Sequence, residues 1–488
     1  MNRGAIMTMN WVAAMLLTSA AAVSAPAAAQ QSQQAEIDAL KAQLQELQRT
    51  VADLQKAQAK AVPSWRGAPE LSDKDAGLSF KPKGFAQFDA GYVGMPGDLA
   101  ETLGPTGTGV SLNTNNLGFN GRARRLVIGA EGSLGSGFGF NLEFNFAQGQ
   151  IDYEDILLTY QRSGNPLQLR VGNMFPLSSL ETMTSSLRTS FLERASFTDA
   201  FNYNRRLGVV AAYVDPKDRW TLSGGLFGQP INDASFNRTG WQGSLRGTYA
   251  PKLGDNRLHL GLNYQYRTNQ RDAQNGRYRS RPLTQLTDQR LVDTGQIAAG
   301  GDQVLGVELG YQAGSLHIAA EGQRLWVRGY RPGQTFSPNN GVGGGTTRFY
   351  AGDPSFWGGY AEVGYYLTGE TRGYKGGRWD RTKVLKPVGK GGMGAVQLVG
   401  RVDAVDLSDR VGGGTPTYPD FVNGGRQVGY QLGLNWLPID NVRFSANYGR
   451  VEVSGGALSA LVEPVSGEPV DRRDFGIDVF AARAQVEF

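Results

Sequence analysis

From Gly84 to the C-terminus, apolar and polar residues alternate with a period of two. Phe138–Ala147 shows this most clearly, because Phe and Leu alternate there with Gly, Asn, Glu and Ala. Successive side chains of a β-strand point to opposite faces, so the period predicts strands with one apolar and one polar face. The pattern returns in Arg257–Arg267 and Gln427–Trp436, and about sixteen such segments follow one another along the chain.

Two features favour a membrane barrel over a soluble sandwich. The apolar faces carry aromatic residues at their ends, as the girdles of membrane barrels do, and the opposite faces carry polar residues and glycine. After the N-terminus, no apolar run approaches the roughly 20 residues of a membrane helix, so a helical span is not expected. Barrel strands need no such run, because only every second residue of a strand faces lipid. We therefore expect an all-β fold over residues 83–488, a 16-stranded antiparallel transmembrane β-barrel. A barrel of about sixteen strands encloses water, whereas one of about eight packs solid.

The chain ends in an alternating segment whose last residue is Phe488. A final amphipathic strand that ends in phenylalanine resembles the recognition strand of bacterial outer-membrane proteins. Residues 1–29 read as a secretory signal peptide, with Arg3, an uncharged apolar stretch and Ala27-Ala28-Ala29 before the expected cleavage at Gln30. Both ends of the chain thus predict export through the periplasm to the Gram-negative outer membrane.

Residues 30–61 are rich in Gln, Ala, Leu, Lys and Glu. Their apolar residues are spaced alternately three and four apart, as Ile37, Leu40, Leu44, Leu47, Val51 and Leu54. This a/d seam predicts an α-helical coiled coil and hence self-association, and β-branched residues at a with Leu at d favour a dimer. A single helix on a membrane surface is the alternative. Residues 62–82, from just before Pro63, are expected to be a linker.

Composition narrows the chemistry. The chain has no cysteine and only two histidines, so we expect neither a cysteine zinc site nor any other metal site or cofactor. Arginine outnumbers lysine about three to one and the net charge is +5. The arginines are spread along alternating strands without a basic helix or finger motif, so nucleic acid is not an expected partner. Guanidinium keeps its charge at any working pH and binds oxyanions in bidentate fashion.

Most arginines in the middle of strands are expected to face water, because a guanidinium facing lipid costs about 2–4 kcal/mol at the bilayer midplane. Arg124 and Arg125 have opposite parity. One of the two must therefore lie at a bulge, at a strand end or under another element. Six other arginines occupy positions of their strands that are expected to face inward: Arg170, Arg246, Arg257, Arg401, Arg443 and Arg483.

The segment Phe175–Asn204 breaks the alternation. A connection of about thirty residues in a large membrane barrel often folds inside the barrel and narrows it, and Arg188 and Arg194 would then face the passage. Farther along, Arg277, Arg279 and Arg281 alternate with Tyr278 and Ser280. Strand spacing would put the three arginines on one face, about 6.6 Å apart, where an anion could pass between them. A solvated outer loop is the alternative.

Five segments together resemble the phosphate-selective porins O and P. They occur in the order in which that family has them and span essentially Gly84–Phe488. They are Arg122-Ala123-Arg124-Arg125-Leu126; Leu180-Glu181 with Ser185-Ser186 and Phe191-Leu192-Glu193-Arg194; Arg279-Ser280-Arg281-Pro282 with Val292-Asp293-Thr294-Gly295; Leu367-Thr368-Gly369-Glu370-Thr371-Arg372; and Gly400-Arg401-Val402-Asp403 with Val405-Asp406-Leu407-Ser408-Asp409.

The resemblance implies a sixteen-stranded trimeric barrel with an arginine ladder that leads to an arginine-lined constriction. By position, the ladder would be Arg277, Arg279 and Arg281; the constriction would be Arg124, Arg125 and Arg194, with Asp155 as the carboxylate beside it. Two departures weaken the expected positive field. The first strand, Gly84–Asp89, carries no arginine, and the internal segment carries no lysine.

The sequence therefore predicts an outer-membrane porin, not an enzyme, whose partners are membrane lipid and small anions such as phosphate. Gly389–Val396 fits the glycine-rich loop of kinases. However, the chain has no lysine after Lys390 that could serve as the ATP-binding lysine of a kinase, and neither His259 nor His317 begins an HRD motif. Two rival functions remain. One is a non-selective or sugar-type porin. The other is an envelope tether whose coiled coil contacts peptidoglycan or another periplasmic component.

Overall fold

The structure is a computed structural model that describes residues 38–52, 64–65, 68–73, 75–94, 117–231, 240–269, 275–295, 297–328, 353–410, 421–455 and 474–488. The chain divides into two compact units, Met1–Pro63 and Ser64–Phe488. The expected signal peptide, residues 1–29, lies outside the described residues.

The second unit contains a closed antiparallel barrel. Within the described residues it has sixteen main strands, each paired with its neighbours along the chain, and the last strand pairs with the first. The strands are β3 (Leu78–Val93), β4 (Gly118–Gly135), β5 (Phe138–Asn145), β6 (Asp152–Tyr160), β7 (Leu167–Met174), β8 (Arg206–Val214), β9 (Trp220–Phe227), β10 (Gln242–Tyr249), β12 (Asn256–Thr268), β17 (Gly301–Ala313), β18 (Leu316–Arg328), β19 (Ser355–Tyr366), β22 (Ala395–Arg410), β23 (Phe421–Ile439), β24 (Val442–Ser454) and β25 (Asp474–Glu487).

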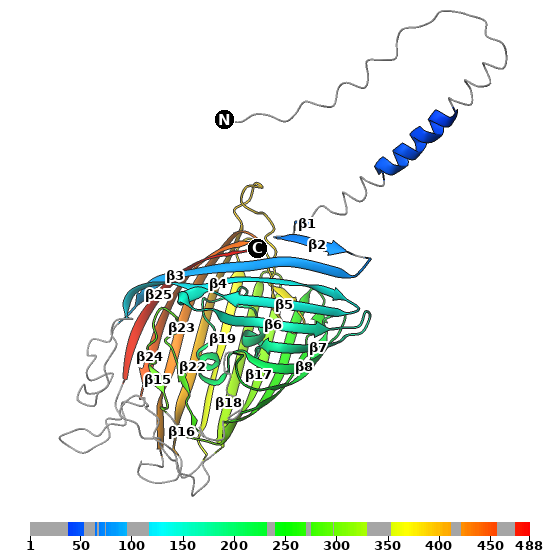
Figure 1. The fold of residues 1–488 in the computed structure, drawn as a ribbon. Helices are drawn as coiled ribbons and strands as arrows, with labels where there is room; N and C mark the ends of the chain where they lie inside the picture. The colour runs from blue at the N-terminus through cyan, green and yellow to red at the C-terminus, as the bar shows by residue number, and fades with distance from the viewer. Residues whose placement is uncertain are drawn as a thin grey trace, which may run out of the picture. The chain divides into compact units, whose positions relative to one another are not determined.

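Figure 1 shows β25 beside β3, where the barrel closes. At one end of the barrel, here called the turn end, strands are joined by short turns, such as Gly314-Ser315 between β17 and β18. Phe488 lies at this end and pairs with Gly84. At the opposite, loop end the connections are longer, including residues 175–205 between β7 and β8. Short periplasmic turns and long extracellular loops are typical of bacterial outer-membrane barrels.

The alternation predicted from the sequence appears as two faces of the wall. On β12, His259 and Asn263 are each 1% exposed, whereas Leu262 between them is 55% exposed. On β23, Gln431 is buried and its neighbour Leu432 is exposed. Outward apolar and inward polar residues therefore follow the expected parity, with hydrocarbon-compatible side chains on the outside.

Aromatic residues gather at both ends of the outer wall. At the turn end, Tyr213 stacks on Trp220 with ring centroids 4.4 Å apart, and Trp436 stacks on Phe444 at 5.5 Å. At the loop end, Tyr92 contacts Phe119 with ring centroids 4.9 Å apart, and Trp241 contacts Tyr266 at 5.4 Å. Two aromatic girdles around an apolar band are the signature of an outer-membrane barrel.

The expected linker, residues 62–82, is partly wrong. It contains β1 (Ser64–Trp65), β2 (Pro69–Asp73) and the beginning of β3. β1 pairs with β2, which pairs with β3 in turn. Prolines and charges suggested a loop, but a strand at the edge of a pairing tolerates both because some of its backbone groups need no partner.

The first unit is described over 38–52, where the chain is helical. Leu40, Leu44, Leu47 and Val51 are exposed along it. The rest of the expected coiled coil lies outside the described residues, and its pairing with further helices stays a prediction. Among the described residues, no helix has the length and hydropathy needed to cross a membrane.

Residues 175–205 fold into the barrel, as expected for the segment that breaks the alternation. The segment holds two short helices, α3 (Leu180–Met183) and α4 (Ser196–Phe201). Arg443 on β24 donates to the carbonyl oxygens of Thr189 and Ser190, at 2.7 and 3.0 Å. Asp403 on β22 accepts from the backbone N–H of Ser196 at 2.7 Å. Inward side chains of distant strands thus hold the segment in place.

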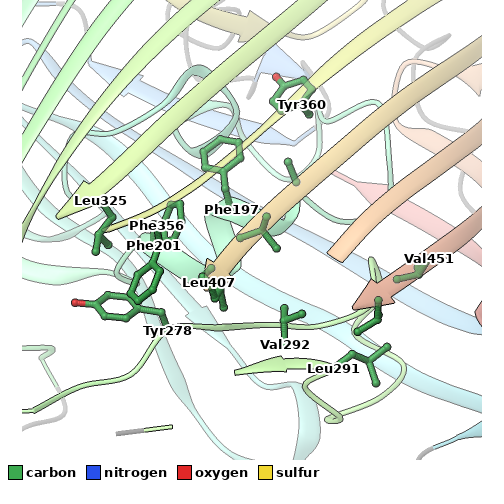
Figure 2. Packing of buried hydrophobic residues seen from close by; sticks show 14 of the residues in the cluster. Phe197, Phe201, Tyr278, Leu291, Val292, Leu325, Phe356, Tyr360, Leu407 and Val451 are labelled. Atoms are coloured by element: carbon green, nitrogen blue, oxygen red, sulfur yellow. The ribbon is translucent and has the colours of Figure 1, made fainter. Parts of the chain in front are cut away.

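A hydrophobic core lies between this segment and one side of the wall. Phe197 and Phe201 of α4 pack with Phe356 on β19 and with Tyr278, which belongs to the connection between β12 and β17 (Figure 2). Further members come from β18, β22 and β24, namely Leu325, Leu407 and Val451. This packing fills the barrel on the side of β17 to β25 and leaves the opposite side, along β3 to β8, for the bore.

The connection between β12 and β17 includes four short strands, β13 (Asn275–Gly276), β14 (Arg279–Ser280), β15 (Val292–Asp293) and β16 (Ile297–Ala298). Tyr278 and Val292 are buried in the same core, so this connection is anchored inside the barrel mouth.

At the turn end, the connection between β19 and β22 also turns inward. Its hairpin consists of β20 (Gly373–Lys375) and β21 (Arg378–Asp380). Arg246 on β10 donates to the carbonyl oxygen of Gly377 at 2.8 Å, and Tyr374 contacts His259 Nδ1 at 2.7 Å. The bore is therefore narrowed from both ends.

The remaining described elements are β11 (Lys252–Leu253) and a 3-10 turn at Ala147–Gly149.

Candidate functional site: the arginine-lined bore

A β-bulge places neighbouring arginines on the same side of β4. Gln87 on β3 pairs with Arg125, but the next residue, Phe88, pairs with Ala123, so Arg124 is an extra residue in the ladder. A bulge sets two residues of one strand against one of its partner and redirects their side chains. Arg124 and Arg125 both turn inward as a result. The opposite parity of the doublet predicted an irregularity of this kind, and the bulge confirms it.

Arg124 belongs to an ion-pair network. Its Nε lies 2.8 Å from Glu193 Oε1, and Arg483 on β25 lies 2.9 Å from the same carboxylate. Arg483 also pairs with Asp89 at 2.6 Å. Burial alone would raise the pKa of Glu193, but Arg124 and Arg483 together lower that pKa well below its ordinary value. The charge of Arg124 is thus largely offset.

Two large water-accessible cavities lie in the part of the bore that the structure describes. The loop-side cavity, of about 580 Å³, is lined by Arg281 and Arg290 together with residues of β4 and the internal segment. The turn-side cavity, of about 560 Å³, is lined by Lys83, Arg378 and Glu487 among others. Six residues line both cavities and so mark the passage between them: Arg125, Glu154, Phe175, Thr182, Arg194 and Arg205.

Two of the predicted constriction arginines lie at this passage with neutral partners. Arg125 Nη1 donates to the amide oxygen of Gln87 at 3.0 Å. Arg194 donates from Nε to the carbonyl oxygen of Glu181 at 2.9 Å and from Nη2 to that of Thr184 at 2.8 Å. Within the described part of the chain, neither guanidinium forms an ion pair with a carboxylate. Burial lowers the pKa of Arg194, but a guanidinium remains protonated in proteins.

The third arginine of the passage, Arg205, was missed by the sequence reasoning. Its Nε lies 2.5 Å from Asp155 Oδ1, and its Nη1 contacts Glu154. Its guanidinium also lies over the ring of Phe175, 4.2 Å from the centroid. The predicted carboxylate Asp155 therefore lines the turn-side cavity beside the passage, but its partner is Arg205 rather than Arg124, Arg125 or Arg194. The doublet Arg205-Arg206, of mixed parity like Arg124-Arg125, was the available signal.

Arg188 extends from the internal segment to the last strand. Its guanidinium is bidentate to Glu487, at 2.7 and 2.6 Å, and it lines the turn-side cavity. Arg381 lies 3.0 Å from the same carboxylate. Arg188 thus faces the bore but is ion-paired.

The three predicted ladder arginines point away from the hydrophobic core. Tyr278 and Ser280 are buried between them, whereas Arg279 is exposed and Arg277 and Arg281 are half-buried. Only Arg281 lines the loop-side cavity; it lies 3.5 Å from Asp199 and 3.3 Å from Asp288. Arg277 is bound by Asp293, and this hydrogen bond raises the pKa of Arg277. For Arg279, no ion pair is present among the described residues.

Both histidines lie in buried contacts on the inner wall. His259 Nε2 lies 3.1 Å from Glu308, and His317 Nε2 lies 3.7 Å from Glu362. In the part of the chain that the structure describes, no group of three His, Asp or Glu side chains could hold a metal ion.

An antiparallel barrel with an apolar outer wall, two aromatic girdles and a polar, doubly narrowed bore is a porin of the bacterial outer membrane. The family model of the phosphate-selective porins O and P matches residues 108–463. The chain belongs to that family, and it is accordingly a channel protein rather than an enzyme.

Two curated relatives are similar to this chain. An uncharacterised protein of Caulobacter vibrioides is 37% identical over 435 residues, which cover 87% of this chain and 77% of the relative. Porin O of Pseudomonas aeruginosa is 28% identical over 322 residues, which cover 63% of this chain and 70% of the relative.

Solved structures of other outer-membrane proteins align over most of the chain at low identity. The channel DcaP of Acinetobacter baumannii is 12% identical, with 85% of this chain and 98% of that chain covered and a TM-score of 0.45. OmpT of Vibrio cholerae is 11% identical, with 86% and 99% covered and a TM-score of 0.46.

Proposed function

We propose that this porin is selective for small anions and that phosphate is its leading substrate. One observation carries the proposal: Arg125 and Arg194 line the passage between the two cavities, and among the described residues they donate hydrogen bonds to an amide oxygen and to backbone carbonyls. Their positive charges are left to attract a mobile anion. The name of the family, phosphate-selective porins, supports phosphate as the anion.

The chemistry of this passage suits an oxyanion. Guanidinium is permanently charged and offers a planar fork of donors that matches phosphate. Conduction also requires that each site bind weakly and that the next site be near. Arg378 in the turn-side cavity provides such a neighbour, and so do Arg281 and Arg290 in the loop-side cavity, where the two guanidinium groups share the single carboxylate of Asp199.

A non-selective porin is the second candidate, and one specific contact favours it. Glu154 lies at the passage, Asp155 lies beside it in the turn-side cavity, and both offset the charge of Arg205. A passage with carboxylates on one wall and arginines on another discriminates less between ions, because each sign of charge finds a partner. Sugar-type diffusion would be compatible with such a passage.

Reversal potentials in planar bilayers under a salt gradient test the proposal. We expect anion preference in the wild type, loss of most of it in Arg125→Gln and Arg194→Gln, and no change in Arg219→Gln, whose arginine pairs with Asp215 at a turn outside the bore. Cation preference in the wild type would refute anion selectivity. A chloride current that millimolar phosphate does not reduce would refute the phosphate assignment and leave anion selectivity in place.

The oligomer and the N-terminal region form a separate part of the proposal. Homotrimers are expected from the family resemblance, and the exposed residues Leu40, Leu44, Leu47 and Val51 offer a helix face on which copies could associate. Deletion of residues 30–61 discriminates the roles. A pore that uses this region only for association keeps its conductance, whereas an envelope tether loses its attachment to peptidoglycan.

A further inference from the structure

Two arginines of β18 point out of the barrel near its loop end. His317, Glu321 and Gln323 of this strand are buried against the interior, so the alternate residues Arg324 and Arg328 are on the outer side. Arg324 is exposed and Arg328 is half-buried. An outward guanidinium at the bilayer midplane costs about 2–4 kcal/mol, and the cost falls to about 0–1 near the interface. The two arginines must therefore lie at the level of lipid headgroups.

The surrounding aromatic residues agree with this level. The guanidinium of Arg328 lies 4.0 Å from the ring centroid of Tyr266, and that of Arg324 lies 6.0 Å from the ring of Trp326. Trp357, opposite Arg324 on β19, is also exposed. Tryptophan and tyrosine concentrate where the hydrocarbon meets the headgroups.

Neither arginine has an acidic partner in the described part of the chain. Arg324 Nη2 donates to Ser355 Oγ at 2.8 Å; Arg328 donates to Tyr266 Oη at 2.5 Å and to the carbonyl oxygen of Arg267 at 2.7 Å. Arg450, also outward, differs because it pairs with Glu452 at 2.6 Å and with Asp478 at 3.2 Å. Both guanidinium groups are thus held by neutral groups and remain open to an anion; the carboxylate of Asp409 contacts Ser355, at 3.2 Å from its Oγ, and no ion pair between Asp409 and Arg324 is present among the described residues.

On the side of Arg324 nearer the membrane centre, the outer surface of the wall is apolar and has a shallow depression where two glycines face each other. Gly322 pairs with Gly359, and a Cβ at Gly322 would meet a single atom, the carbonyl oxygen of Gly358 at 4.0 Å. Leu305 and Val307 of β17 are exposed beside them. A lipid whose headgroup reached the arginines could lay its acyl chains against this surface.

We infer that Arg324 and Arg328 bind the phosphorylated headgroup of an outer-leaflet glycolipid, the bisphosphorylated disaccharide of lipopolysaccharide. The two residues are four positions apart on one face of a strand, which separates their Cα atoms by about 13 Å. That separation suits a disaccharide that carries a phosphate at each end, with one guanidinium for each phosphate. This inference depends on the position of the barrel in the outer membrane and not on which solute passes its bore.

Native mass spectrometry of the full mature protein with added lipid A tests the site. We expect bisphosphorylated lipid A to bind the wild type, and the double variant Arg324→Gln, Arg328→Gln to bind it at least tenfold more weakly. The matched control is Arg426→Gln, because Arg426 is also exposed on the outer side but lies opposite Asp406 in the strand register. Heat-modifiable gel migration and single-channel conductance should be those of the wild type in all variants.

A second arm changes the lipid and needs no variant. Dephosphorylated lipid A should bind the wild type at least tenfold more weakly than the bisphosphorylated form. Equal binding of the two lipids, or undiminished binding by the folded double variant, would overturn the inference. A loss of binding in Arg426→Gln as large as in the double variant would also contradict it, since attraction would then follow overall charge and not this pair.

Discussion

Arg205, which lines both cavities, forms an ion pair with Asp155, which lines the turn-side cavity, with 2.5 Å between Nε and Oδ1. The two residues are 50 positions apart. Arg205 comes at the end of the internal segment, directly before β8, and Asp155 lies on β6. Because Arg205 is flanked by two carboxylates while Arg125 and Arg194 are not, the three arginines of the passage should contribute unequally to selectivity.

Arg205→Gln should reduce anion selectivity more than its own charge suggests. The substitution leaves Glu154 and Asp155 uncompensated beside the passage, and these carboxylates would attract cations. We expect the ratio of anion to cation permeability to fall severalfold in reversal-potential measurements. The double variant Arg205→Gln, Asp155→Asn should recover most of the loss; if it does not, the pair has no electrostatic role in the passage.

Glu193→Gln should destabilise the barrel. Glu193, whose side chain is 14% exposed, accepts from both Arg124 and Arg483, and because removal of one partner from a fully buried ion pair costs about 3–5 kcal/mol, we expect a cost somewhat below that range. We expect a lower urea concentration at the unfolding midpoint, measured by tryptophan fluorescence in detergent. Glu452→Gln, which removes an exposed partner of Arg450, should change the midpoint little.

The stabilising effect of Glu193 should depend on pH in one direction. Its folded-state pKa is lowered below an unfolded value of about 4.3, so its contribution is fully present above pH 5 or so and is lost as the pH falls through the folded pKa. The difference in unfolding midpoint between wild type and Glu193→Gln should therefore be constant from about pH 5 to 9 and shrink in stronger acid. A difference that grew on acidification would show that the carboxylate is not stabilised as an anion.

Arg281 and Arg277 should behave differently when neutralised. Arg281 lines the loop-side cavity, whereas Arg277 is held by hydrogen bonds of 2.5 to 3.0 Å to Asp293. We expect Arg281→Gln to weaken the block of chloride current by phosphate several times more than Arg277→Gln does. Equal effects would mean that the three ladder arginines contribute equally to the electric field at the mouth of the bore.

Arg279→Glu should lower anion selectivity if the ladder takes part in conduction.

Arg443→Met should loosen the internal segment. Arg443 donates to the carbonyl oxygens of Thr189 and Ser190, and the loss of hydrogen bonds from a charged donor costs about 1.5–3 kcal/mol. We expect noisier open-channel currents and entry of larger solutes in liposome-swelling assays. Unchanged noise and unchanged size limits would mean that the hydrophobic core around Phe197 and Phe201 suffices to hold the segment.

The barrel itself could be predicted because it rests on a local property. Side chains alternate across any strand, so the apolar sequence positions of β12 and β23 identify the outer wall without knowledge of what they contact. The mixed parity of Arg124 and Arg125 likewise required an irregularity. In the same way, the loss of alternation in Phe175–Asn204 indicated a segment outside the wall.

The charge balance of the bore was decided only by the tertiary structure. An arginine attracts anions when no carboxylate offsets it, and the carboxylates come from remote strands: Asp89 reaches Arg483 across 394 positions, and Glu487 reaches Arg188 across 299. The bulge at Arg124, the closure of β25 on β3 and the path of the internal segment set these pairings. The sequence by itself determined which residues face the water, because strand geometry is local; which of those charges remain free depends on contacts that only the folded barrel creates.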